Sequence, residues 1–163
     1  MLLRVAGIVN DSIVDGPGIR MTVFVQGCTH NCKGCHNPDT HALDGGEMIE
    51  VREIAEKAFE NPLLDGLTFS GGEPFLQCEP LCELADLVAV KGLNIIAYTG
   101  FTWENLILRE DAVRLIKRCR YIIDGPFVLE KKSLMLNFRG SENQRIIDVK
   151  KSLETGRIYT VQL

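Results

Sequence analysis

Apolar and polar positions along the chain follow two different periods, and the period of each segment predicts its secondary structure. Short runs rich in β-branched and aromatic residues predict core strands over 21–26, 66–69, 93–98 and 121–123. Apolar residues at helical spacing predict helices over 47–60, over 80–90, and through Ala112, Leu115, Ile116 and Cys119. Thr102 resembles an N-cap, and two last apolar pieces, 146–149 and 158–161, are predicted edge strands.

This alternation of strands and helices predicts an α/β fold with a mostly parallel sheet covered by helices. The alternating part is much shorter than the ~250 residues of a closed eight-stranded barrel, so we expect an open partial (β/α) barrel. No repeat or linker interrupts residues 1–163, which we treat as a single domain. Ligands of such folds gather at the carboxyl ends of strands. Four polar or glycine-rich segments follow predicted strands and should share one site: 27–35, 70–73, 99–100 and 124–127.

Composition narrows the possible partners. The chain of 163 residues is 45% hydrophobic and 25% charged, which is ordinary for a globular protein. No apolar run approaches the ~18 residues of a membrane helix. Asn10, Asp11 and Asp15 interrupt the N-terminal apolar stretch, so we expect no signal peptide and a cytoplasmic protein. The net charge of −4 argues against nucleic acid, leaving a small molecule or another protein as partner.

Three of the six cysteines crowd into eight residues, where Cys28, Cys32 and Cys35 form a C-x3-C-x2-C triplet. Three adjacent thiolates can hold three irons of a [4Fe–4S] cluster and leave the fourth iron open for chemistry. The alternative is a zinc site completed by a histidine (His30, His36 or His41) or a distant cysteine. Zinc patterns usually contain a second ligand pair, and none is present, so the spacing favours iron–sulfur over zinc.

The triplet after a strand resembles the signature of the radical S-adenosylmethionine enzymes. That resemblance implies a radical S-adenosylmethionine type of partial barrel, with S-adenosyl-L-methionine bound at the open iron and cleaved there. Ser70, Gly71, Gly72 and Glu73 match the Gly-Gly-Glu motif of that family, whose backbone and carboxylate hold the methionyl ammonium. Glycines permit close approach of a ligand to the backbone, and a carboxylate complements an ammonium group.

Two further segments, 14–20 and 35–40, resemble the glycyl-radical-enzyme activases within that family. Segments 124–127 and 138–145 resemble the anaerobic ribonucleotide reductase activating proteins. The resemblance implies that the partner is the large reductase subunit, on which a glycyl radical is generated, and that flavodoxin or ferredoxin donates the electron. Three alternatives stay open: activation of another glycyl radical enzyme such as pyruvate formate-lyase, radical chemistry on a metabolite, and a non-enzymatic zinc or electron-transfer module.

Within this resemblance, the remaining residues near the cysteines have less specific roles. The family often has an aromatic residue before the third cysteine, but Gly34 stands here, so adenine contact would fall to the Gly34 backbone and to His36. Thr99 would reach the methionyl carboxylate or the ribose. We expect His30 to be a solvated loop residue. Asp124 would either face the ribose or partner, or cap a turn.

Two arginines and three cysteines complete the candidates. Arg139 and Arg145 could contact a carboxylate-bearing partner surface, because guanidinium forms directed paired hydrogen bonds. Cys78 and Cys82 are expected to be ordinary thiols, and Cys119 a small core residue.

Overall fold

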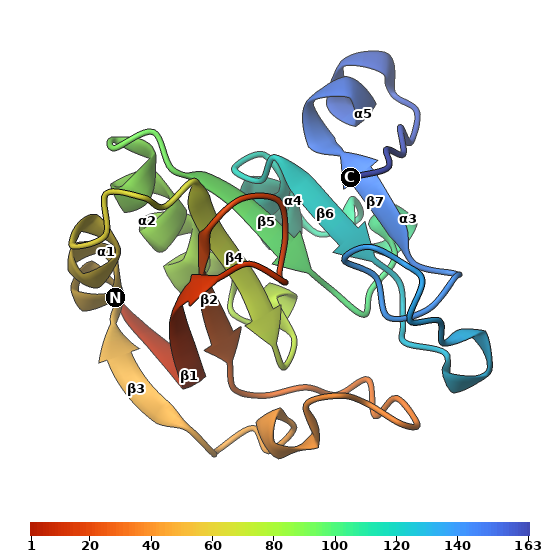
Figure 1. Cartoon of the computed structure of the whole chain (residues 1–163), viewed down its shortest axis with the longest axis horizontal. Helices are drawn as coiled ribbons and strands as arrows, with labels where there is room; N and C mark the ends of the chain where they lie inside the picture. The colour runs from red at the N-terminus through yellow and green to blue at the C-terminus, as the bar shows by residue number, and fades with distance from the viewer.

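A seven-stranded β-sheet runs through the molecule, with its strands in the order β3-β1-β2-β4-β5-β6-β7 (Figure 1). The computed structural model describes residues 1–163. The strands are β1 (Leu2–Ser12), β2 (Arg20–Val25), β3 (Glu47–Glu50), β4 (Gly66–Gly71), β5 (Asn94–Tyr98), β6 (Tyr121–Asp124) and β7 (Arg145–Asp148).

The centre of this sheet is parallel and its margins are antiparallel. Strands β2, β4, β5 and β6 pair in parallel. The pairs β1–β2, β1–β3 and β6–β7 are antiparallel. The edge strands β3 and β7 do not pair with each other, so the sheet is open. The predicted α/β class and open arrangement are confirmed, whereas the predicted predominance of parallel strands holds only for the four central strands.

The helices are α1 (Val51–Phe59), α2 (Cys78–Ala89), α3 (Trp103–Leu106), α4 (Glu110–Ile116) and α5 (Val149–Thr155). Helix α2 packs between α1 and α4. Each of these three helices buries most of the apolar positions that its sequence spacing predicts, as Val51, Ile54, Ala55 and Ala58 do in α1, whereas Phe59 is 37% exposed. None of the helices has the length and apolar content needed to cross a membrane.

The two faces of the sheet are covered differently, because successive strand residues point to opposite sides. Val23, Phe69 and Ile95 join the side chains of α1, α2 and α4 in a core of 30 buried residues. On the other face, Ile96, Ile123 and Ile146 form a separate small cluster.

The loop between β1 and β2 lies on this second face and contains the glycine-rich motif 14–20. The Asp15 carbonyl accepts a hydrogen bond of 2.8 Å from the Thr68 hydroxyl. Arg20 is 1% exposed and its Nε donates to the same hydroxyl at 2.8 Å. Burial lowers the pKa of Arg20 to about 10. The motif therefore covers the second face of the sheet near the start of β2 and β4.

Near the N-terminus one prediction is wrong and one strand was missed. The predicted helix over 47–60 begins only at Val51, because Glu47–Glu50 forms β3 and pairs with the start of β1. Strand β1 itself was not predicted. Strand β3 is held by the first residues of β1, whereas β1 pairs with β2 along Val5–Ser12, so both strands are defined by partners that are distant in the sequence.

The C-terminal region also differs from prediction. Segment 146–149 belongs largely to β7, but 158–161 contributes only an isolated bridge between Ile147 and Thr160. Helix α5 lies between them and was not predicted. Its N-cap Asp148 accepts a hydrogen bond from the Lys151 backbone, and Gly156 ends it in a left-handed conformation.

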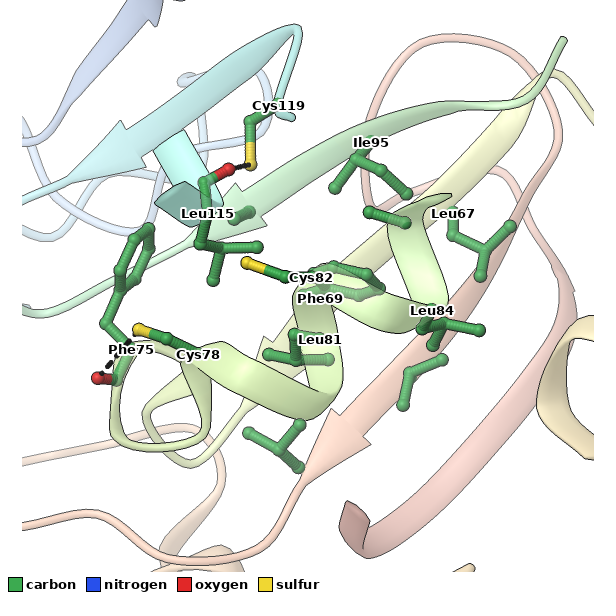
Figure 2. Close-up of a cluster of buried hydrophobic side chains, with 14 of the residues drawn as sticks. Leu67, Phe69, Phe75, Cys78, Leu81, Cys82, Leu84, Ile95, Leu115 and Cys119 are labelled. Atoms are coloured by element: carbon green, nitrogen blue, oxygen red, sulfur yellow. Dashed lines mark hydrogen bonds between the residues drawn. The ribbon is translucent and has the colours of Figure 1, made fainter. Parts of the chain in front are cut away.

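The three scattered cysteines are core residues. Figure 2 shows Cys78 and Cys82 on α2 among buried leucine and phenylalanine side chains, with Cys119 nearby. Cys119 lies beyond α4, which ends at Ile116, so its predicted place on a helix is wrong while its predicted burial is confirmed. The Cys78 thiol donates to the Phe75 carbonyl at 3.3 Å. Burial raises the pKa of Cys78 to about 12 and also raises the pKa values of Cys82 and Cys119.

Candidate iron–sulfur site

The Gly-Gly-Glu turn lies directly against the start of the cysteine loop, because β4 and β2 are parallel neighbours that end together. The Gly72 amide donates to the Val25 carbonyl at 2.8 Å, and the Glu73 amide donates to the Gly27 carbonyl at 2.7 Å. A Cβ atom on Gly72 would lie 2.3 Å from the Gly27 oxygen. Only glycine therefore permits this contact between the two loops.

The carboxylate of Glu73 accepts hydrogen bonds from several segments of the site. The residue is 0% exposed. Its Oε1 accepts a hydrogen bond of 2.8 Å from the Gly100 amide, and its Oε2 accepts one of 2.9 Å from the Phe75 amide. The Thr99 hydroxyl lies 2.9 Å from both oxygens. Donors from the ends of β4 and β5 thus satisfy both carboxylate oxygens, as a buried charge requires.

His30 supplies a further donor to this carboxylate. Its Nε2 lies 2.5 Å from Glu73 Oε1, and its side chain is only 16% exposed. The imidazole also packs edge-on against Phe101, with ring centroids 4.4 Å apart. The prediction of a solvated loop residue is wrong, because the end of β5 encloses the ring. The only sequence signal for this enclosed position was a histidine two residues after the first cysteine, together with Gly100 in the facing loop.

The cysteine loop is held at both ends by backbone hydrogen bonds. The Gly27 and Cys28 amides donate to the carbonyls of Thr40 and His41 at 2.7 and 3.1 Å. At the far end, the Cys35 amide donates to the Cys32 carbonyl at 3.2 Å, and His41 Nε2 lies 3.4 Å from Cys35 Sγ. The loop therefore has fixed ends and a middle tied down by His30.

All three loop cysteines are free thiols and half-buried. Burial raises the pKa of the Cys28 thiol, and the nearby carboxylate of Glu73 acts in the same direction. No group of three or more histidine, cysteine or acidic side chains surrounds the position of a single metal ion. A set of three free thiols on one loop is the soft donor set that suits an iron–sulfur cluster.

Gly34 and His36 connect the cysteine loop to the segment after β6. Gly34 has a φ of +75°, and a Cβ atom there would lie 2.9 Å from a methyl group of Leu129. The His36 ring packs on Phe127, with centroids 4.9 Å apart. The sequence prediction that the segments after four strands share one site is confirmed for their positions, since all of them meet at this edge of the sheet.

Asp124 and Arg145 lie beside this edge but form an ion pair with each other. Asp124 is 1% exposed and accepts hydrogen bonds from Arg145 Nη2 at 2.5 Å and from the Trp103 amide at 2.8 Å. Arg145 also pairs with Glu104 at 2.6 Å. These bonds raise the pKa of Arg145. Contact of Arg145 with a partner stays a prediction, and Asp124 caps the start of α3 rather than the Asp124–Gly125 turn.

Arg139 is half-buried rather than freely exposed. Its Nη1 donates to the Gln144 carbonyl at 3.0 Å, and its Nε is buried without a hydrogen-bond partner. Both Arg139 and Arg145 therefore form hydrogen bonds within the protein.

Comparison with known proteins identifies the family. Residues 14–147 match the family described as a 4Fe-4S single cluster domain. The chain belongs to this family. It is 34% identical over 142 residues to the anaerobic ribonucleoside-triphosphate reductase-activating protein of Vibrio cholerae, covering 82% of this chain and 90% of the relative. The protein of that name from Escherichia coli K12 is 32% identical over 143 residues, which cover 81% of this chain and 90% of the relative.

A second kind of relative is also similar to this chain. The pyruvate formate-lyase-activating enzyme of Clostridium pasteurianum is 38% identical over 121 residues, which is 69% of this chain. The match spans only 51% of that longer enzyme, about half of its length. The predicted resemblance to activating proteins is confirmed, and the 4Fe–4S family match supports an iron–sulfur cluster in this chain.

Proposed function

We propose that this protein activates an anaerobic ribonucleoside-triphosphate reductase by generating a glycyl radical on it, through reductive cleavage of S-adenosyl-L-methionine at a [4Fe–4S] cluster. The observation that carries the proposal is the contact between the C-x3-C-x2-C loop and the Gly-Gly-Glu turn at the carboxyl ends of parallel strands. Relatives with the name of such an activating protein match along 90% of their length, which supports the choice of partner.

In this proposal, Cys28, Cys32 and Cys35 bind three irons and leave the fourth open. When bound, the reduced cluster would donate one electron to S-adenosylmethionine, which would yield methionine and a 5′-deoxyadenosyl radical able to remove the α-hydrogen of a glycine. The protein itself needs no general base for this reaction, because it binds, orients and shields the reacting groups. The open sheet is then a partial barrel of the radical S-adenosylmethionine type.

The remaining residues of the site would either bind the cofactor or support the turn that binds it. Ser70, Gly71 and Gly72 offer backbone groups to the methionyl part, while Glu73 and Thr99 support this turn from the interior. Gly34 and His36 lie on the exposed side of the cysteine loop and would contact the adenine. The electron would come from flavodoxin or ferredoxin in the cytoplasm.

One observation favours a second candidate, activation of a pyruvate formate-lyase. The highest of the identities reported above, 38%, is to an enzyme with that function. Its match is confined to half of that longer enzyme, so we place this candidate second.

The test is anaerobic reconstitution with iron and sulfide, followed by electron paramagnetic resonance of the reduced protein. We expect a [4Fe–4S]⁺ signal that changes shape on addition of S-adenosylmethionine, with release of methionine and 5′-deoxyadenosine. Addition of the reductase subunit should then give a glycyl radical doublet. A variant in which Cys32 is replaced by alanine is the control and should give neither signal.

Other outcomes would reject parts of the proposal. A cluster that does not respond to S-adenosylmethionine would indicate an electron carrier. A glycyl radical on pyruvate formate-lyase but not on the reductase would select the second candidate. Colourless protein containing zinc would reject the cluster itself.

A further inference from the structure

His30 connects three segments that are distant in the sequence. It lies on the cysteine loop after β2, it reaches the carboxylate of Glu73 after β4, and its ring packs against Phe101 after β5. The middle of the cysteine loop is thus fixed to the ends of two neighbouring strands.

The fit of the imidazole requires a glycine in the facing loop. A Cβ atom on Gly100 would lie 2.5 Å from His30 Cδ2 and 2.7 Å from its Nε2. The φ of Gly100 is not in the left-handed region, so its backbone conformation is open to other residues. The space taken by the His30 ring is what excludes a larger residue at this position.

The hydrogen bonds of Glu73 also limit what its carboxylate can do for a ligand. Oε1 faces His30, Thr99 and Gly100, while Oε2 faces Phe75 and Thr99. The residue is 0% exposed, and both of its oxygens already have hydrogen-bond partners within the protein. The carboxylate is arranged to hold protein groups.

We propose that His30 is a positioning residue, which ties the Cys28–Cys32 part of the loop to the buried Glu73 carboxylate and so sets how the cluster faces S-adenosylmethionine. This inference rests on the proposed function. It assigns the contact with the methionyl ammonium to the backbone of the Gly71–Gly72 turn, and it gives the Glu73 carboxylate the task of holding the loop.

The first experiment compares His30→Phe with His30→Gln. Phenylalanine keeps a ring against Phe101 but cannot donate to Glu73, whereas glutamine keeps a donor. We expect both variants to take up the cluster. In His30→Phe, the concentration of S-adenosylmethionine that half-converts the electron paramagnetic resonance signal should rise about tenfold, which equals about 1.4 kcal/mol. His30→Gln should recover most of this loss.

The second experiment tests whether Gly100 acts through the His30 ring. We expect Gly100→Ala alone to raise the half-converting concentration as much as His30→Ala does, because the new methyl group displaces the ring. In the His30→Ala background, Gly100→Ala should add almost nothing, since residues in contact are not additive. Gly7→Ala is the matched control, because a Cβ atom there meets no atom within 4 Å.

The results separate this inference from the function on which it rests. If the wild-type signal responds to S-adenosylmethionine and His30→Phe responds with the same affinity, the positioning role is refuted while the function stands. Tighter binding by His30→Phe would show that the ligand competes with His30 for Glu73, which also refutes it. If the wild type never responds, the function fails and the inference fails with it. Independent, additive losses from Gly100→Ala and His30→Ala would contradict the proposed contact.

Discussion

Individual glycines decide how closely the two loops of the site approach each other. Gly71 has a φ of +94°, and a Cβ atom there would lie 2.7 Å from the Val25 amide nitrogen. Gly72 has an ordinary φ but lies under the Gly27 backbone. The first glycine is needed for both its conformation and its space, and the second for space alone.

Replacement of Gly72 by alanine should therefore destabilise the apo-protein. The added methyl group would lie 2.3 Å from a backbone oxygen that cannot rotate away. We expect a loss of about 1–3 kcal/mol in the free energy of unfolding, as is usual for overpacking. Urea unfolding measures this change, with Gly7→Ala as a control that should stay close to wild type. Equal stability of the two variants would show that the Gly27–Gly72 approach is not as close as described.

Cysteine reactivity should divide the six thiols into two groups. Cys28, Cys32 and Cys35 are half-buried, whereas the other three are at most 9% exposed. The thiolate is the reactive form, and burial raises the pKa values of that second group, to about 12 for Cys78. Burial also raises the pKa of Cys28, so the exposure of the thiols sets the division. Iodoacetamide at about pH 8 should alkylate the three loop cysteines of native apo-protein and reach Cys78, Cys82 and Cys119 only after denaturation.

Mass spectrometry of peptides from the alkylated protein locates the adducts. Labelling of Cys78 at the rate of Cys32 in the native protein would contradict the described core. Reconstitution of the cluster should protect the loop cysteines, provided that they are its ligands.

At the scale of elements, the Asp124–Arg145 ion pair holds β6, β7 and α3 together. Asp124 ends β6 and caps the start of α3 through the Trp103 amide, while Arg145 begins β7. The pair also aligns the antiparallel register of β6 and β7, in which these two residues are direct partners. A buried carboxylate that loses its only cation is costly, because it cannot recover its hydration.

Arg145→Met should accordingly lower the free energy of unfolding by about 2 kcal/mol, less than for a fully buried pair because Arg145 is 31% exposed. Glu104→Gln is the matched control and should cost less than about 1 kcal/mol, since Glu104 is 59% exposed. Denaturant unfolding measures both. Identical losses would indicate that Asp124 is not the partner that matters.

The Glu104 contribution has a defined pH dependence. The hydrogen bond from Arg145 holds the pKa of Glu104 below its usual range. A lowered acid pKa in the folded state means stabilisation that is present at neutral pH and is lost as the pH falls through that pKa. The stability difference between wild type and Glu104→Gln should thus shrink between about pH 5 and pH 3. A difference that stays constant over this range would exclude this ion pair as its source.

At the scale of the whole molecule, the sheet should be most stable at its parallel centre. Strands β2, β4 and β5 are paired on both sides and carry core residues such as Val23, Phe69 and Ala97. Strand β3 is a short edge strand with exposed or half-buried residues. Amide exchange measured by mass spectrometry should be slowest in the three central strands and faster in β3, because edge strands open locally. Slower exchange in β3 than in β4 would contradict this order.

Local sequence patterns were sufficient for the centre of the fold and for the residue types of the site. Segments 21–26, 66–69 and 93–98 are strong strand formers, and they became β2, β4 and β5. Their loops were correctly expected at one edge, since parallel strands place their carboxyl ends together. The cysteine spacing and the Gly-Gly-Glu motif are local in sequence, so their chemistry could be read without the structure.

Only the tertiary structure decided which groups these residues meet. The β1–β3 pairing joins residues about 45 positions apart, and β3 has no strong local strand signal. The burial of Glu73, the orientation of His30 and the pairing of Arg145 with Asp124 depend on distant partners that periodicity does not encode. The sequence by itself thus determined the kind of chemistry and the sheet edge where it lies. The folded chain decided which side chains face a ligand and which hold the loops, because hydrogen bonding and burial are properties of three-dimensional neighbours.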